Sequence, residues 1–306
     1  MYRRKYGKHK KRVIALIILL FLIAVGIKTT QYFITSKTKI VQAVVIGEKS
    51  NFSEKTISLA EEVKPVEAEL IKGINVISLG DKFTFDAEEI QNMLNGSEKQ
   101  KDGKKIAFLT FDDGPSTTVT PQILETLKES NVKATFFIVG SSLEKSEKAK
   151  EILKREYAEG HAIGNHTYSH RYDILYPKST INVQSFMNDI EKNQEIIKTI
   201  LGDEFHTRVI RFPGGHMSWK GTNEIDKVLK EKNYNYIDWN AFNGDAQGTN
   251  KKDKDKLVKN LIKTANGKDK LIVLMHDTYG KESTAQALPE IIKYLKEQGY
   301  DFKTLK

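Results

Sequence analysis

The feature that most constrains the fold is a regular alternation of short β-rich runs and helical patterns, which begins at Lys105. Such alternation predicts parallel strands joined by crossover helices. Over about 200 residues, this many strands favour an α/β barrel, incomplete or distorted, over an open doubly wound sheet. The strand candidates are 106–111, 135–139, 161–164, 209–211, 234–239, 270–275 and 300–304, and the helical patterns are 121–130, 146–158, 180–201, 223–230, 254–265 and 284–298.

Two adjacent carboxylates follow the first of these strands. The stretch 110–116 (TFDDGPS) joins the end of an apolar run to a turn signal, shortly before the helix start at Thr120-Pro121. In α/β folds this edge of the sheet is where chemistry is usually placed. Neighbouring acids repel each other, but a cation held by Asp113 or Asp112 leaves the other free to act as a base. The alternative is a turn whose aspartates cap the helix.

Further polar groups follow later strands. His166 and His170 are spaced i, i+4, which predicts two imidazoles on one face of a helical turn, a spacing typical of metal ligands. Arg211 is a candidate to orient a carboxylate, and the glycines of the turn 213–215 free backbone amides to face a ligand. His276 ends an apolar run, where a general acid would lie. Each has an ordinary explanation as a surface pair, a salt bridge or a polar strand end. Together they indicate a metallohydrolase with Asp and His ligands.

The ordered set TFDDGPS, HTYSH, RFPGG, DWN…GD and LMHD resembles the motifs of the polysaccharide deacetylases, carbohydrate esterase family 4 (the NodB-homology domain), over about residues 105–306. The resemblance implies a distorted (β/α)7 barrel and a divalent metal, usually zinc. It also implies removal of acetyl groups from N-acetylated polysaccharides. The metal ligands that it implies are Asp113, His166 and His170.

The same resemblance implies roles for the remaining motif residues. Asp112 matches the catalytic base, Arg211 the arginine that positions it, His276 the general acid, and Asp245 the aspartate that keeps this histidine charged. Gly214 falls where a backbone N–H helps to bind the oxyanion, and Leu274 matches a wall of the acetyl pocket. Gly214 stands where the family often has an aromatic residue, so the groove is expected to be more open here. Ala246 stands where the family often has tryptophan, and these two departures leave the sugar specificity open.

Composition excludes several other classes of site. The chain has no cysteine, so any metal site must use His, Asp or Glu side chains. The formal net charge is +9, but residues 1–12 alone carry seven positive charges and no acid, which leaves +2 for the remainder. The charge is therefore poor support for nucleic-acid binding. No Gly-x-Gly-x-x-Gly follows the first strand and no Walker loop is present, which argues against a nucleotide cofactor.

The N-terminal region is predicted to hold the chain at a membrane. The basic tail 1–12 precedes an apolar run at 13–27, and we expect a transmembrane signal-anchor over 13–34 with the tail in the cytoplasm. A cleaved signal peptide, and hence secretion, is the alternative. Residues 35–104 are expected to form a stalk or small accessory region, with a short helix at 86–94 capped by Asp86.

These observations predict a membrane-anchored, extracytoplasmic, metal-dependent deacetylase acting on N-acetylglucosamine of cell-wall peptidoglycan. Within enzymes, the alternatives are deacetylation of N-acetylmuramic acid, an exopolysaccharide or chitin oligomers, and O-acetyl esterase activity. From another class, the chain could be an inactive wall-binding protein on the same fold. An inactive protein is expected to have lost a base or a ligand, and all of these residues are present.

Overall fold

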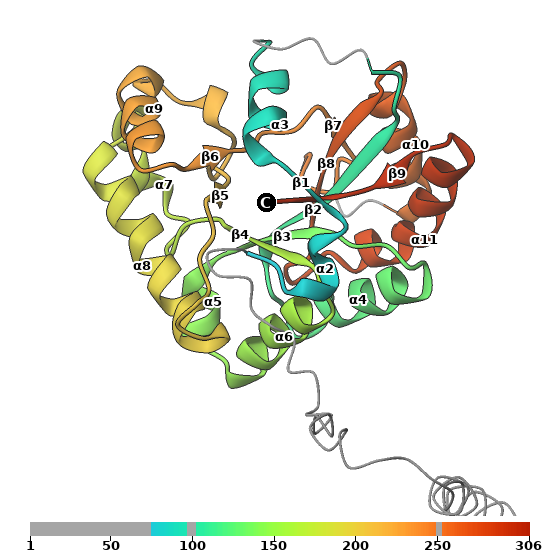
Figure 1. The fold of residues 1–306 in the computed structure, drawn as a ribbon, viewed down its shortest axis with the longest axis horizontal. Coiled ribbons are helices and arrows are strands. Elements are labelled where there is room, and N and C mark those ends of the chain that lie inside the picture. Colours follow the sequence, from blue (N-terminus) through green and yellow to red (C-terminus); the bar gives the residue numbers. More distant parts are fainter. Residues whose placement is uncertain (1–74, 97–101, 249–252) are drawn as a thin grey trace, which may run out of the picture. The chain divides into compact units, whose positions relative to one another are not determined.

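The computed structural model describes residues 75–96, 102–248 and 253–306, and its centre is a curled sheet of parallel strands (Figure 1). Neighbours follow the order β6-β5-β4-β3-β2-β8-β7, and β9 pairs with the start of β2. The strands are β2 (Ile106–Gly114), β3 (Thr135–Ile138), β4 (Ala162–Asn165), β5 (Val209–Ile210), β6 (Asn235–Tyr236), β7 (Ala241–Phe242), β8 (Lys270–His276) and β9 (Asp301–Phe302).

The curl of the sheet follows from the connection between its two edge strands. Residues 237–240 alone join β6 to β7, although these strands lie at opposite ends of the strand order. A connection of this length spans at most about 17 Å, so the two edges must lie near each other. Along the way, Ile237 N donates to Ile210 O (2.9 Å) and Asn240 N to Ile272 O (3.2 Å). The predicted α/β class with curled parallel strands is therefore confirmed.

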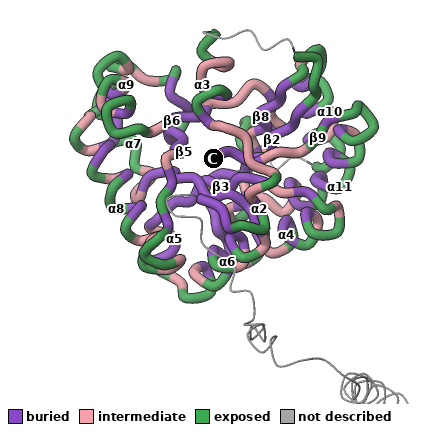
Figure 2. Tube along the Cα trace, viewed as in Figure 1, coloured by how far each residue is buried: buried purple, intermediate pink, exposed green. Residues whose placement is uncertain are grey.

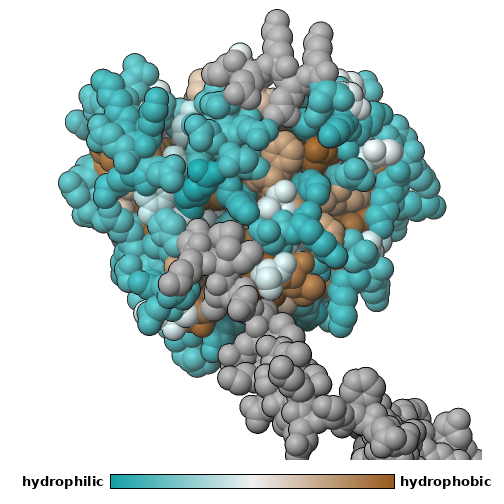
Figure 3. Space-filling view, in the orientation of Figure 1, coloured by the Kyte–Doolittle hydropathy of each residue, from teal (hydrophilic) through white to brown (hydrophobic). Residues whose placement is uncertain are grey.

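Helices surround the strands, and the burial pattern in Figure 2 shows buried strands within a ring of helices whose outer sides are exposed. The longer helices are α4 (Thr120–Glu129), α6 (Glu147–Ala158), α8 (Val183–Leu201), α9 (Thr222–Glu231), α10 (Lys254–Ala265) and α11 (Glu282–Glu297). Short helices lie in the connections: α5 (Gly140–Glu144), α7 (Tyr172–Leu175), η1 (Pro177–Ser179) and η2 (His216–Ser218). The face shown in Figure 3 is largely hydrophilic, with smaller hydrophobic areas between the hydrophilic residues.

The two faces of β2 explain why the site forms at one end of the sheet. Ala107, Leu109 and Phe111 belong to the core beneath the helices, whereas Ile106 and Phe108 belong to the core enclosed by the sheet. Because side chains alternate along a strand, the inner row continues from Phe108 to Thr110 and Asp112. The enclosed face is thus apolar at its start and polar at its carboxyl end.

Residues 75–96 pack against this sheet, although they fall within the range 35–104 that was expected to form a stalk or accessory region. Asn75 Nδ2 donates to the carbonyls of Ile163 and Leu305, both at 3.0 Å. After the short helix α2 (Ser78–Asp81), β1 (Thr84–Phe85) pairs with β10 (Thr304–Leu305). The predicted helix at 86–94 is confirmed as α3 (Ala87–Leu94), whose cap Asp86 accepts from two backbone N–H groups.

The buried side of α3 completes the enclosed core. Ala87 and Ile90 are fully buried in the cluster that also contains Phe108, Ile272 and Leu305. Residues 35–74, and the membrane anchor predicted at 13–34, lie outside the described residues. In the part of the chain that is described, no helix is long and apolar enough to cross a membrane.

Candidate metal centre and catalytic site

An irregularity in β2 brings Asp112 and Asp113 into one site. In a regular strand, adjacent side chains point to opposite faces of the sheet. Here the register with β3 shifts between Asp112 and Gly114, and Asp113 has φ +70°, in the left-handed region that few non-glycine residues adopt. As a result both carboxylates approach His166 Nε2, with Asp112 Oδ2 at 3.7 Å and Asp113 Oδ1 at 3.4 Å.

Asp113, His166 and His170 form the only group of potential metal ligands found among the described residues. One ligand atom from each lies within 4.8 Å of the others. His170 Nε2 is 3.2 Å from Asp113 Oδ1, and that oxygen is buried without a hydrogen-bond partner. The predicted ligand set is therefore brought together, and its mixture of one carboxylate and two imidazoles suits a divalent metal.

The surroundings of His166 leave one of its ring nitrogens able to bind a metal ion. Its Nδ1 lies 2.9 Å from the carbonyl oxygen of Arg211, which can only accept, so Nδ1 carries the proton. Nε2 is then left with its lone pair toward Asp113. This arrangement, in which a backbone group fixes the tautomer of a ligating histidine, is common in metal sites. Burial acts to raise the pKa of Asp113, but the positive charge that His166 and His170 carry when protonated lowers it, so this carboxyl stays ionised.

The loop that carries the two histidines differs from the expected helical turn. Residues 166–170 form no helix, and Thr167 (φ +67°) and His170 (φ +52°) both lie in the left-handed region. Side chains replace the helical hydrogen bonds: Thr167 Oγ1 accepts from His170 N, and Asp189 Oδ2 accepts from Ser169 N. The two rings still converge, with centroids 5.0 Å apart. The i, i+4 spacing thus predicted two converging imidazoles, which the structure shows, on a helical backbone, which it does not show.

A buried arginine holds Asp112. Arg211 follows β5 and is fully buried. Its Nη1 donates to Asp112 Oδ1 (2.8 Å) and to Thr110 Oγ1 (2.7 Å), while Nε donates to Ile237 O (2.7 Å). The guanidinium also lies 4.1 Å above the ring of Phe137. Arg211 therefore fixes the orientation of Asp112 and compensates the charge of this buried carboxylate.

A second acid–base pair lies across the site at the end of β8. His276 pairs in register with Asp112 on the neighbouring strand. Its Nδ1 is 2.8 Å from Asp245 Oδ1, and its backbone N–H donates to Asp245 Oδ2 (2.9 Å). Burial acts to lower the pKa of His276, but the hydrogen bond and charge of Asp245, together with the negative charges of Asp112 and Asp113, raise it to about 9. His276 is therefore an imidazolium at neutral pH.

Asp245 is itself well anchored. Thr284 Oγ1 donates to its Oδ2 at 2.7 Å, and Lys281 Nζ donates to its carbonyl oxygen at 2.9 Å. Burial acts to raise the pKa of Asp245, but His276 and these neighbours lower it. The remaining predicted residues also lie at this end of the sheet. Leu274 is two positions before His276 and so shares its inner face. Gly214 has φ +78°, and within the described structure its N–H donates to no protein acceptor.

Several contributors were not singled out from the sequence. Thr110 and Asp112 both accept hydrogen bonds from the guanidinium of Arg211. Because Thr110 lies two residues before Asp112 in a strand, its position on the same face could have been predicted from the sequence. Asn193, in the middle of α8, donates to Asn165 Oδ1 and to Ile138 O, and so secures the ends of β3 and β4. Nothing in the local sequence around Asn193 indicates this long-range contact. Likewise, the local sequence around Thr284, which lies near the start of α11, does not indicate its hydrogen bond to Asp245.

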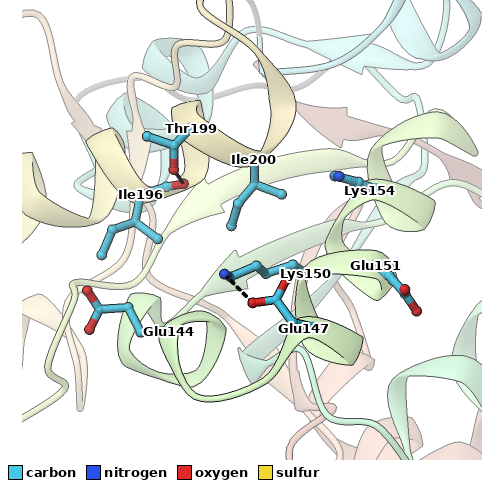
Figure 4. Close-up of a pocket in the computed structure, with 8 residues that line it drawn as sticks. All are labelled: Glu144, Glu147, Lys150, Glu151, Lys154, Ile196, Thr199 and Ile200. Atoms are coloured by element: carbon cyan, nitrogen blue, oxygen red, sulfur yellow. Dashed lines mark hydrogen bonds and ion pairs between the residues drawn. The ribbon is translucent and has the colours of Figure 1, made fainter.

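A hollow elsewhere on the molecule contains none of these residues. It lies on the outer surface between α5, α6 and α8 (Figure 4). An exposed ion pair between Lys150 and Glu147 (2.7 Å) lies at its edge. Its polar rim and two isoleucines resemble ordinary helix surface. The lining residues are Glu144, Glu147, Lys150, Glu151, Lys154, Ile196, Thr199 and Ile200.

Comparison with known proteins agrees with the geometry. A sequence model described as polysaccharide deacetylase matches residues 99–237. A peptidoglycan-N-acetylglucosamine deacetylase of Bacillus cereus is 37% identical over 205 residues, which cover 66% of this chain and 67% of the relative. The peptidoglycan-N-acetylglucosamine deacetylase PgdA of Listeria monocytogenes is 36% identical over 207 residues, which cover 68% of this chain but only 39% of the longer relative.

Among solved structures, a CE4 esterase from Streptococcus mutans superposes with a TM-score of 0.71 at 38% identity, covering 78% of this chain and 98% of the other. The catalytic domain of a peptidoglycan N-acetylglucosamine deacetylase from Eubacterium rectale gives a TM-score of 0.59 at 30% identity, covering 68% of this chain and 92% of that domain. The residues matched by the family model include Asp112, Asp113, His166, His170, Arg211 and Gly214. The chain belongs to the polysaccharide deacetylase family, carbohydrate esterase family 4.

Proposed function

We propose that this chain is a metal-dependent hydrolase that removes N-acetyl groups from N-acetylglucosamine in peptidoglycan. The observation that carries the proposal is the convergence of the Asp113–His166–His170 triad with two hydrogen-bonded pairs, Asp112–Arg211 and His276–Asp245, at one end of the sheet. A site with a separate base and acid beside a cation can hydrolyse an amide. The names of the relatives from Bacillus cereus and Listeria monocytogenes support peptidoglycan as the substrate.

Asp113, His166 and His170 would hold the metal, and zinc is the ion we propose. One carboxylate and two imidazoles, with no thiolate in the chain, are ligands that zinc accepts while keeping an open position. When bound, the cation supplies Lewis-acid chemistry, polarising the acetyl carbonyl and favouring ionisation of water.

Asp112 is the proposed base. It would accept the proton of the water that attacks the acetyl carbonyl, because Arg211 orients it and it does not share the ligand position of Asp113. The Gly214 N–H would donate to the oxygen that becomes negatively charged, and Leu274 would line the pocket for the acetyl methyl group.

His276 is the proposed acid. An amine leaves poorly unless it is protonated, so the histidine must begin the cycle charged. Asp245 stabilises that charge from one ring nitrogen, which leaves Nε2–H to face the substrate nitrogen. Asp112 would thus accept the proton of the attacking water, and His276 would donate a proton to the leaving amine.

We further propose that the N-terminal segment anchors the domain on the outer face of the cytoplasmic membrane, beside the wall. The basic tail and the apolar run at 13–27 support this orientation. Protease added to intact, wall-stripped cells should then digest the catalytic domain while the anchor stays in the membrane. Recovery of soluble protein with a new N-terminus near residue 28 would instead show a cleaved signal and secretion.

Metal dependence provides the direct test of the site. A chelator should abolish release of acetate from peptidoglycan, and added zinc should restore it. The double variant His166→Ala/His170→Ala should bind no metal and show no activity, whereas His206→Ala, which removes an exposed histidine that belongs to none of these clusters, should retain both. Full activity in the double variant would contradict the assignment.

A further inference from the structure

Exposed apolar side chains gather around the mouth of the site. Among the described residues, the large hydrophobic side chains classed as exposed are Leu79, Tyr172, Ile174, Met217, Ile262 and Tyr279. Tyr172 and Ile174 follow β4, Met217 follows β5 and Tyr279 follows β8. These four therefore lie on loops at the same edge of the sheet as the metal ligands. Apolar surface concentrated beside a polar site indicates a ligand-binding surface rather than scattered exposure.

Tyr172 is the member of this group closest to the ligands, and its ring is held in place. It is 46% exposed. On its covered side the ring contacts His170 (centroids 5.5 Å apart) and meets the edge of Trp219 (5.2 Å). Trp219 stacks on Tyr176 at 4.0 Å and 13°, and its Nε1 donates to Pro213 O (2.9 Å). The exposed face of Tyr172 thus belongs to a rigid aromatic cluster.

Tyr172 also covers the backbone of Gly214. A Cβ atom at position 214 would lie 3.2 Å from the Tyr172 hydroxyl and 3.1 Å from Trp219 Cζ2, so these two rings occupy the space that a side chain there would need. The positive φ of Gly214 disfavours a side chain independently. Tyr172 therefore forms the wall of the site between the metal ligand His170 and the free N–H of Gly214.

We propose that Tyr172 is the platform on which the acetylated sugar ring stacks, an inference that rests on the proposed function. One face of a hexosamine ring presents C–H groups, which pack well against an aromatic ring. With that face on Tyr172, the acetamido group can reach the metal triad and the Gly214 N–H. Because the ring is already fixed by His170, Tyr176 and Trp219, little side-chain entropy is lost when the sugar binds.

Binding and turnover of an N-acetylglucosamine oligomer test this role. Binding to the zinc-loaded protein can be followed by tryptophan fluorescence, since the chain has 2 Trp and one of them, Trp219, contacts Tyr172. Tyr172→Ala should raise Kd and KM about tenfold, with a smaller change in kcat. Tyr172→Phe keeps the ring and should bind nearly as the wild type does. Leu79→Ala, which removes an apolar side chain of similar exposure outside this group (54%), is the matched control and should change neither constant.

Unchanged Kd in Tyr172→Ala, or equal weakening in Tyr172→Phe and Tyr172→Ala, would overturn the stacking role. So would the absence of any oligomer binding by the wild-type protein. Failure of the proposed function has a different signature, in which the wild type binds the oligomer but releases no acetate. Metal content measured on each variant should equal that of the wild type, and metal loss in Tyr172→Ala would assign the residue to support of His170 instead.

Discussion

Among the single residues, Asp112 and Asp113 are chemically identical neighbours, but the backbone conformation at Asp113 gives them different partners. The positive φ and the register shift direct Asp113 to His166 and His170, while Arg211 holds Asp112. Backbone strain of this kind costs about 1–3 kcal/mol and is typical of functional sites. We therefore expect different phenotypes when each of the two aspartates is substituted.

Asp112→Asn should reduce kcat by a factor of about 10²–10⁴, the usual cost of losing a positioned base, and leave metal content nearly unchanged. The comparison is Asp113→Asn, which should lose metal as well as activity. Metal analysis and steady-state kinetics on the two purified variants decide the point. Loss of metal in Asp112→Asn would show that the two roles are reversed.

The charge of His276 predicts the alkaline limb of the pH profile. Activity requires the protonated imidazole, so kcat/KM should fall as pH rises through the pKa of His276, about 9. Asp245 is the partner that raises this pKa, so Asp245→Asn should move the limb to lower pH. Profiles of kcat/KM for both proteins test this. If the alkaline limb lies at the same pH in Asp245→Asn as in the wild type, His276 is not the acid.

At the scale of elements, Arg211 joins the strands around the site. It reaches Thr110 and Asp112 on β2 and the carbonyl of Ile237 after β6. Arg211→Met should lower the free energy of unfolding by about 3–5 kcal/mol, because it leaves Asp112 buried without its partner. Arg208→Ala, which breaks a partly exposed pair with Asp86, should cost at most about 1 kcal/mol. Equal urea midpoints for the two variants would contradict this.

Most elements of the domain could be predicted because their signals are local. The alternation of apolar runs and amphipathic helices marks β2, β3, β8 and the long helices to within a few residues. The two-residue strand β7 was missed because it is too short to show a pattern and is defined by its pairing with β8. The non-helical loop at 166–170 was missed for a related reason, since its shape depends on distant partners such as Asp189. The candidate site residues that converge in the structure could be selected from their motifs, whereas the bulge that orients Asp112 and Asp113 could not be predicted.

At the scale of the whole molecule, residues 75–96 should be required for stability. The charged, polar stretch at 98–105 suggested a domain boundary, but residues 75–96 contact the sheet on the other side of it. These contacts are long-range in sequence and could not be predicted from the local pattern. A protein beginning at Lys105 would uncover Phe108 and Leu305 and lose buried Ile90. At about 1.5–3 kcal/mol for each large apolar side chain, this loss approaches the whole stability of an ordinary domain.

The protein beginning at Lys105 should therefore unfold at a much lower temperature than one beginning at Pro65, or aggregate on expression. Thermal unfolding followed by circular dichroism compares the two. Identical melting curves would show that residues 75–96 are dispensable and that the domain starts where the sequence pattern changes.

Mass spectrometry of peptidoglycan is the direct test of the proposed deacetylation. Purified peptidoglycan is incubated with the zinc-loaded protein and then digested to muropeptides, with the Asp112→Asn variant as control. We expect loss of acetyl from N-acetylglucosamine with the wild type and almost none with the variant. Loss of acetyl from N-acetylmuramic acid would show that the other sugar is the substrate, and loss of O-acetyl groups alone would show that the protein is an esterase. Unchanged muropeptides with the fully metal-loaded wild type would contradict the proposed deacetylase activity.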